Sequence, residues 1–142
     1  MLKGIPRLLS PELVKVLMEM GHGDEIVFAD GNFPAASHNS RVIRCDGHGI
    51  PELLNDILTL FPLDSYVEEP VALMAVEARD DFIPSIWDVY KNTVAEACNT
   101  NVRFEKMERF AFYERAKSAY AIVATGEKAL YANILLKKGT IN

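Results

Sequence analysis

The sequence has little of what marks the specialised classes of protein. Its only cysteines are Cys45 and Cys98, and no motif pairs them, so a disulfide scaffold is excluded and a reducing cytoplasm is the simplest setting. No apolar run approaches the roughly 18 residues that a membrane-spanning helix requires. The first residues also lack the long apolar core of a signal peptide. We therefore expect a cytoplasmic protein.

Basic residues are too few to favour a polyanionic partner. The chain has 15 Lys and Arg against 20 Asp and Glu, a net charge of −5, and its pI is near 5.2. Such a surface repels phosphate groups, so neither nucleic acid nor an anionic membrane is expected to bind. With 142 residues, of which 49% are hydrophobic and 25% charged, the composition is that of an ordinary globular protein. We expect a single domain that spans residues 1–142.

Apolar segments separated by polar turns predict an α/β fold. The expected helices cover residues 11–20, 51–60, 84–98 and 110–119. The expected strands cover residues 25–29, 41–45, 71–76, 102–107, 120–124 and 132–136, with a loop over 31–40 and a turn between the last two strands at 125–128. Several strands are apolar throughout, which is typical of sheets covered on both faces. Helices are therefore expected on both sides of the sheet.

His22 is the first candidate for chemistry. The helix before it has Ser10 as its N-cap, Pro11 at its first position and Gly21 as the left-handed residue after its last turn. One interpretation of His22 is a residue that ends this helix and bonds a carbonyl. The other is a general acid or base that titrates near neutral pH. Glycines on both sides favour the second, because they leave the ring unhindered.

Asp30 follows the apolar strand 25–29, and ligands of α/β sheets bind beyond the carboxyl ends of strands. Its alternative role is an Asx turn with the residues after it. A strand of this length rises about 20 Å when extended, so His22 and Asp30 can share a site only if the chain curves or a second subunit closes the gap. Asp64 follows a helix-breaking proline and is either a turn residue or an acceptor for a sugar hydroxyl.

The segment 109–116 is dense in aromatic and charged side chains. Arg109 and Tyr113 are four residues apart and would lie on one helical face. Phe110 and Phe112 diverge on a helix, so they cannot both face the core, and part of this segment should line a pocket or a subunit contact. The alternative is a surface arginine packed across an aromatic ring.

Tyr131 and Asn133 open the last expected strand. Alternation would place both side chains on one side, where a phenol and an amide suit a polyol. The alternative is an edge strand with its polar residues outward. The chain has no Gly-rich phosphate loop and no Cys–His metal spacing, so no cofactor and no metal is expected. Few basic residues accompany these candidates, which disfavours a phosphorylated substrate.

Taken together, these segments resemble the family that contains the L-fucose mutarotases and the D-ribose pyranases. The resemblance extends from Leu2 to Gly139. Its strongest parts are Gly21–Glu25, Asp30 with Asn32–Ala35, Leu63–Tyr66, Arg109–Ala116 and Tyr131–Gly139. The block around Tyr113 points to the fucose branch rather than the ribose branch.

The resemblance implies a layered fold of the ribose-pyranase type, with a central mixed sheet and helices on both faces. It implies a ring-shaped homo-oligomer, a decamer, with active sites at subunit interfaces. It also implies cofactor-free interconversion of the α and β anomers of a free monosaccharide, L-fucose, by opening and reclosure of the sugar ring. By this resemblance the catalytic residues are His22 as proton donor, Tyr113 and Asp64. The substrate-binding residues are Asp30, Arg109, Tyr131 and Asn133.

Two other functions stay open. The first is a ribose pyranase, which would convert pyranose to furanose forms with the same residues. The second is a non-catalytic sugar-binding protein that assists a transporter. A histidine between glycines favours catalysis, because hydroxyl recognition alone seldom requires a group that titrates near neutral pH.

Overall fold

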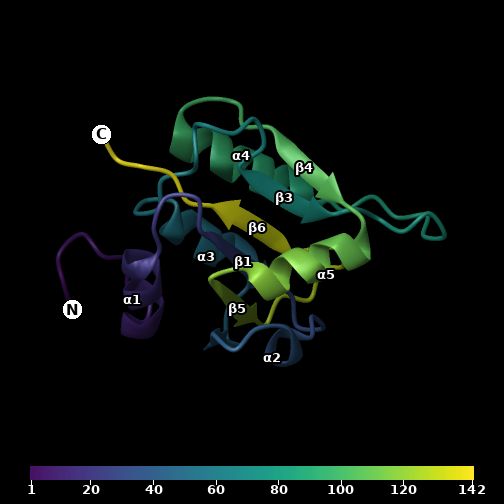
Figure 1. Ribbon diagram of the computed structural model, residues 1–142, viewed down its shortest axis with the longest axis horizontal. Helices are drawn as coiled ribbons and strands as arrows, with labels where there is room; N and C mark the ends of the chain where they lie inside the picture. The colour runs from purple at the N-terminus through teal and green to yellow at the C-terminus, as the bar shows by residue number, and fades with distance from the viewer.

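The computed structural model describes residues 1–142 and contains one six-stranded sheet covered by helices (Figure 1). The strands are β1 (Glu25–Ala29), β2 (Val42–Cys45), β3 (Val71–Met74), β4 (Phe104–Met107), β5 (Ala121–Thr125) and β6 (Ile134–Lys137). The helices are α1 (Pro11–Glu19), α2 (Ala35–His38), α3 (Ile50–Ile57), α4 (Ile86–Cys98) and α5 (Arg109–Ser118). Each expected helix and strand is present, β1 with the expected bounds and the others with shifted ends, and α2 is a short helix inside the segment expected to be a loop. None of the helices has the length and apolar composition that crossing a bilayer requires.

The sheet is mixed, as expected. Its strand order is β2-β5-β1-β6-β3-β4, and β6 runs antiparallel to both of its neighbours while the other pairs are parallel. β1 is paired along both edges, with Val27 opposite Ile122 of β5 and Leu135 of β6. Residues 125–128 do not form a turn between adjacent strands, because β5 and β6 lie on either side of β1. The chain from 126 to 133 passes the carboxyl end of β1 instead.

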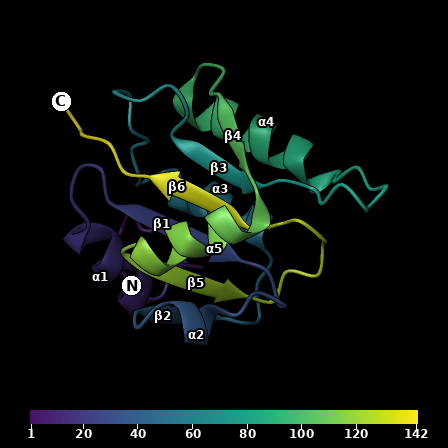
Figure 2. The same cartoon turned by 45° about the vertical axis from the view of Figure 1, so that its right-hand side comes forward.

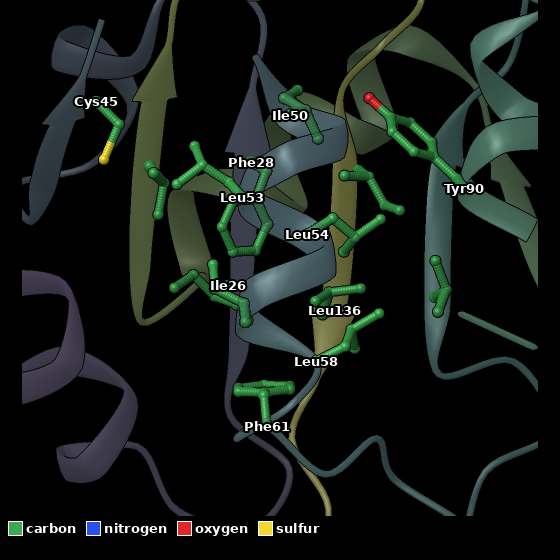
Figure 3. Close-up of a cluster of buried hydrophobic side chains, with 14 of the residues drawn as sticks. Ile26, Phe28, Cys45, Ile50, Leu53, Leu54, Leu58, Phe61, Tyr90 and Leu136 are labelled. Atoms are coloured by element: carbon green, nitrogen blue, oxygen red, sulfur yellow. The ribbon is translucent and has the colours of Figure 1, made fainter. Parts of the chain in front are cut away.

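Helices cover both faces of the sheet, which confirms the expectation from the apolar strands. α1, α3 and α4 pack on one face, where Phe28, Leu54 and Tyr90 are fully buried (Figure 3). α2 and α5 pack on the other face through Ala35 and Phe112. Figure 2 shows α5 in front of the sheet and α3 behind it. The middle strand β1 is therefore enclosed on both faces and along both edges.

The first helix begins as expected and ends differently. The Ser10 hydroxyl accepts a hydrogen bond from the N–H of Leu13 at 3.2 Å, which confirms the N-cap. After Glu19 the chain is extended, and the left-handed residue is Gly23, with φ of +87°, so the prediction for Gly21 is wrong. Because the chain leaves the helix in an extended conformation, the sharp turn follows His22 instead of preceding it.

Gly126 lies where the end of β5 passes the loop after β2. A Cβ atom there would be 2.1 Å from the carbonyl oxygen of Asp46. Backbone cannot move aside as a flexible side chain can, so Gly126→Ala should destabilise the protein by about 1–3 kcal/mol. Gly47→Ala is the matched control, since nothing lies within 4 Å of its Cβ position. Urea unfolding measures both variants, and equal midpoints would contradict this close approach.

Candidate active site

The residues predicted to act together form two groups at opposite edges of the sheet. His22 and Asp64 lie at the amino end of β1, where Asp64 donates its N–H to the carbonyl of Lys137 at the end of β6. Asp30 lies at the carboxyl end of β1, beside Asn133. The strand between them rises roughly 17 Å. The separation expected from the sequence is therefore real within one chain, which does not curve to close it.

The turn that carries His22 is attached to the end of β6. The N–H of Gly23 donates to the carbonyl of Lys138 at 2.8 Å. The Lys138 ammonium in turn donates to the carbonyls of Leu17 and Met20 at the end of α1. These carbonyls lack donors within the helix and carry its partial negative charge. The ammonium supplies hydrogen bonds to them and a compensating positive charge. The backbone of His22 is thereby fixed, while its side chain is 45% exposed.

Asp64 holds the imidazole of His22 in place. His22 Nε2 lies 3.1 Å from Asp64 Oδ1, which also accepts the N–H of Tyr66 at 3.0 Å. Burial of Asp64 opposes its ionisation, but the hydrogen bonds from Tyr66 and His22 outweigh burial, so the pKa of Asp64 is lowered. The ionised carboxylate accepts the Nε2–H proton and leaves Nδ1 free for a ligand. The Tyr66 ring lies beside the imidazole, tilted by 49°, with the ring centroids 5.3 Å apart.

A small cavity of about 240 Å³ opens at the other edge of the sheet. It is lined by the remaining predicted residues, which are Asp30, Arg109, Tyr113, Tyr131 and Asn133. The other polar residues around it are Asn32, Glu77, Arg79 and Asp80, and the apolar ones are Phe33, Met74 and Leu130. Pockets for drug-sized ligands span about 300–1,000 Å³, so this one suits a smaller molecule. Its mixture of carboxylate, guanidinium, amide and phenol groups suits a ligand with many hydroxyls.

Asp30 is held in place by hydrogen bonds to Asn133 and Asn32. Its N–H donates to Oδ1 of Asn133 at 2.7 Å, across the end of the sheet. Its own Oδ1 accepts the N–H of Asn32 at 2.9 Å, so the Asx turn considered as an alternative is present together with the cavity position. Burial raises the pKa of Asp30 and outweighs the hydrogen bonds from Asn32 and Phe33, which lower it. Asp30 is therefore a carboxyl group that accepts a proton more readily than usual.

Arg109 and Tyr113 share one face of α5, as predicted. Arg109 Nε donates to the Tyr113 hydroxyl at 3.2 Å, and another guanidinium nitrogen donates to Glu77 Oε1 at 3.0 Å. The bond to Tyr113, followed by the bond to Glu77, raises the pKa of Arg109. Arg109 in turn lowers the pKa of Glu77. Phe110 is exposed and Phe112 fully buried, which confirms that the two rings point in different directions.

Tyr131 lines the cavity, but the backbone conformation that places it there differs from the predicted one. β6 begins only at Ile134, so strand alternation does not align Tyr131 with Asn133. Instead Tyr131 is in the left-handed region, with φ of +56°, a conformation that costs a non-glycine residue about 1–2 kcal/mol. Its hydroxyl donates to Asp80, and this bond raises the pKa of Tyr131. The two side chains share the cavity because the turn bends, not because a strand alternates.

The sequence interpretation missed the acidic and basic residues that follow β3. Glu77, Arg79 and Asp80 all line the cavity. Glu77 comes after a buried apolar strand in the same way as Asp30, so the rule that pointed to Asp30 could have found it. Arg79 and Asp80 lie in an irregular segment that gives no such signal. No group of three or more His, Cys, Asp or Glu side chains is placed to hold a metal ion.

Comparison with known proteins finds a matching family and a similar relative of nearly the same length. Residues 3–141 match the model of the RbsD / FucU transport protein family. The L-fucose mutarotase of Actinobacillus pleuropneumoniae serotype 5b (strain L20) is 52% identical over 139 residues, which cover 98% of this chain and 96% of that protein.

Two solved structures share the fold. The fucose mutarotase of Streptococcus pneumoniae in complex with L-fucose superposes with a TM-score of 0.92 at 54% identity, over 99% of this chain and 100% of that one. Bacillus subtilis RbsD complexed with D-ribose superposes with a TM-score of 0.74 over 94% of this chain and 95% of that one, and at 24% identity it supports the fold alone. From the match over residues 3–141 and these relatives, the chain belongs to the RbsD / FucU transport protein family.

Proposed function

We propose that this protein is an L-fucose mutarotase, an isomerase that interconverts the α and β anomers of free L-fucose. The observation that carries the proposal is the likeness to the fucose mutarotase in complex with L-fucose, which extends over 99% of the chain at 54% identity. The cavity at the carboxyl edge of the sheet supports it, because its size and its polar groups suit a monosaccharide. No cofactor is required for this reaction.

The reaction needs two proton transfers. A base removes the proton of the anomeric hydroxyl while an acid protonates the ring oxygen, and the ring opens to the aldehyde. Rotation about the bond between the first two carbons, followed by reclosure, gives the other anomer. Positioned acids and bases typically accelerate such transfers by about 10²–10⁴-fold, which suffices for a reaction that also proceeds in water.

We assign one proton transfer to His22. Asp64 fixes its ring through Nε2 at 3.1 Å, so Nδ1 is the nitrogen that exchanges a proton with the sugar. This is the arrangement of a general acid or base whose tautomer is set by a carboxylate. Its counterpart lies in the cavity, where Tyr113 offers a phenol and Asp30 offers a carboxyl group that burial helps to protonate.

The cavity residues would also bind the sugar hydroxyls. Asp30 and Asn133 offer acceptors, and Arg109 offers guanidinium donors beyond those bonded to Tyr113 and Glu77. Tyr131 contributes a hydroxyl that Asp80 orients. Hydroxyls are recognised when the groups that bond them are already held in position, and each of these groups has at least one protein partner.

His22 and the cavity lie too far apart to act on one sugar within a single chain, so we propose that the site is completed by a neighbouring subunit. Large apolar side chains are exposed at both edges of the sheet, as expected of surfaces that pack together. Those near His22 are Met18, Tyr66 and Ile141, and those near the cavity are Phe82, Phe110 and Leu130.

Contact between these two different edges would be heterologous, and heterologous contacts close into rings when the rotation allows it. In such a ring, the His22–Asp64 pair of one subunit would face the cavity of the next. The decamer implied by the family resemblance is part of this proposal. The cytoplasmic location expected from the cysteine content is part of it as well.

Anomer exchange measured by NMR magnetisation transfer tests this function. The wild-type protein should accelerate exchange between the anomers of L-fucose above the buffer rate, and His22→Ala should lower the acceleration by about 10²-fold or more. His48→Ala is the control, because His48 contacts Glu52 and lines neither the cavity nor the His22 group.

Three other outcomes would contradict the proposal. Unchanged exchange in His22→Ala would remove His22 from the mechanism. Faster conversion between pyranose and furanose forms of D-ribose than between fucose anomers would favour the pyranase function. Saturable sugar binding with no acceleration at all would favour an accessory role in transport.

The lowered pKa of Asp64 predicts how stability depends on pH. The folded state holds this proton less tightly than the unfolded chain, so the ionised carboxylate stabilises the fold above its ordinary pKa of about 4. That contribution is lost as the pH falls through the lowered pKa. Asp64→Asn should therefore lose less unfolding free energy than wild type on going from about pH 5 to about pH 2.5. Urea titrations across this range measure the effect.

Asp81→Asn is the matched control, because it removes one exposed carboxylate that has no hydrogen-bonding partner within the protein. Its acid limb should follow that of the wild type. If Asp64→Asn gave the same acid limb as Asp81→Asn, the hydrogen bonds to Asp64 would contribute nothing to its ionisation.

A further inference from the structure

Two side chains of α4 bond consecutive carbonyls of the turn that enters the cavity. The indole N–H of Trp87 donates to the carbonyl of Tyr131 at 2.8 Å. The hydroxyl of Tyr90 donates to the carbonyl of Ala132 at 2.7 Å. Trp87 and Tyr90 are three residues apart and therefore lie on the same face of the helix. Figure 3 shows the Tyr90 hydroxyl extending from α4 toward the chain that leads into β6.

Packing alone requires neither the indole N–H of Trp87 nor the hydroxyl of Tyr90. Tyr90 is fully buried among the apolar side chains of α3, α4 and β6, where a phenylalanine would fill nearly the same volume. Trp87, the only tryptophan in the chain, is 8% exposed. A polar group in such surroundings costs free energy unless it is bonded, and each of these groups has its bond in the same short turn.

The turn they hold carries the binding groups of the proposed site. Tyr131 is in the left-handed region at φ of +56°, which a side chain other than glycine adopts only when its surroundings enforce it. One residue beyond Ala132, the Asn133 side chain accepts the N–H of Asp30 at 2.7 Å. The two carbonyls bonded by α4 thus belong to the same short segment as Tyr131 and Asn133, and Asn133 is hydrogen-bonded to Asp30. Tyr131, Asn133 and Asp30 all line the cavity.

We propose that Trp87 and Tyr90 are positioning residues that hold the Tyr131–Asn133 turn in its strained conformation and so place Tyr131, Asn133 and Asp30 for sugar binding. The inference deepens the proposed function and rests on it. Neither α4 side chain lines the cavity, so neither is a catalytic residue. Both act from the opposite face of the sheet to α5, which supplies Arg109 and Tyr113. The cavity is therefore held from both sides.

Tyr90→Phe is the sharpest test, because it removes a single oxygen atom. Loss of one hydrogen bond of ordinary strength should raise the KM for L-fucose about fivefold, while kcat stays within about twofold and the pH profile is unchanged. Trp87→Phe should have the same effect, and it replaces Tyr90→Phe if that variant fails to fold. Tyr120→Phe is the matched control, since its hydroxyl donates to the exposed Glu19 at the other edge of the sheet.

Hydrogen–deuterium exchange of the segment 129–134 provides a readout that does not depend on catalysis. Its amides should exchange faster in Tyr90→Phe and Trp87→Phe than in wild type, and at the wild-type rate in Tyr120→Phe. If the wild-type protein did not accelerate the interconversion of sugar anomers, the proposed function would fail. The hydrogen–deuterium exchange rates would still decide whether α4 holds the turn.

The opposite results would overturn the inference. A purely structural role for Tyr90 and Trp87 would reduce the amount of active protein, which lowers kcat and leaves KM unchanged. Unaltered KM together with unaltered exchange in the segment 129–134 would show that the turn keeps its conformation without either bond.

Discussion

The pairing of β1 along both of its edges is the constraint on which the rest of the structure depends. Its residues Ile26 to Ala29 are all fully buried, and its neighbours on the two sides are β5 and β6. A strand enclosed in this way cannot bend to bring its ends together. The groups at its two ends are therefore held apart by a fixed length, and the distance between His22 and Asp30 follows from the fold itself. A site that needs both must draw on more than one chain.

β1 also anchors α5, the helix that contributes Arg109 and Tyr113 to the cavity. α5 buries only Phe112 and Ala116 against the sheet, which is little for a helix of its length. Arg115 adds a polar attachment: it bonds Glu25 at the start of β1 through Nε at 3.1 Å and Glu105 of β4 at 2.8 Å. The guanidinium thus ties α5 to strands on opposite sides of β3 and β6. Arg109 and Tyr113 owe their positions at the other end of α5 partly to these ion pairs.

The sequence was sufficient wherever local chemistry decides the structure. Apolar strands predicted a sheet covered on both faces, and the spacing of Arg109 and Tyr113 predicted that they share one helical face. It was not sufficient where contacts with distant segments of the chain determine the local conformation. The left-handed residue is Gly23 rather than Gly21 because β6 holds the turn through Lys138. Tyr131 adopts a positive φ that no pattern indicates, and Glu25 pairs with Arg115 from a distant part of the chain. These outcomes depend on contacts between segments that are far apart in the chain.

Mixing subunits tests most directly whether the site is shared between chains. His22→Ala and Arg109→Ala should each be inactive alone, because one lacks the proposed proton carrier and the other a proposed binding group. When the two variants are unfolded together and reassembled, about a quarter of the sites should combine an intact His22 from one subunit with an intact Arg109 from its neighbour. About this fraction of wild-type anomer exchange should therefore return. If no activity returned from mixed assemblies, both residues would have to act within one chain, and no neighbouring subunit would complete the site.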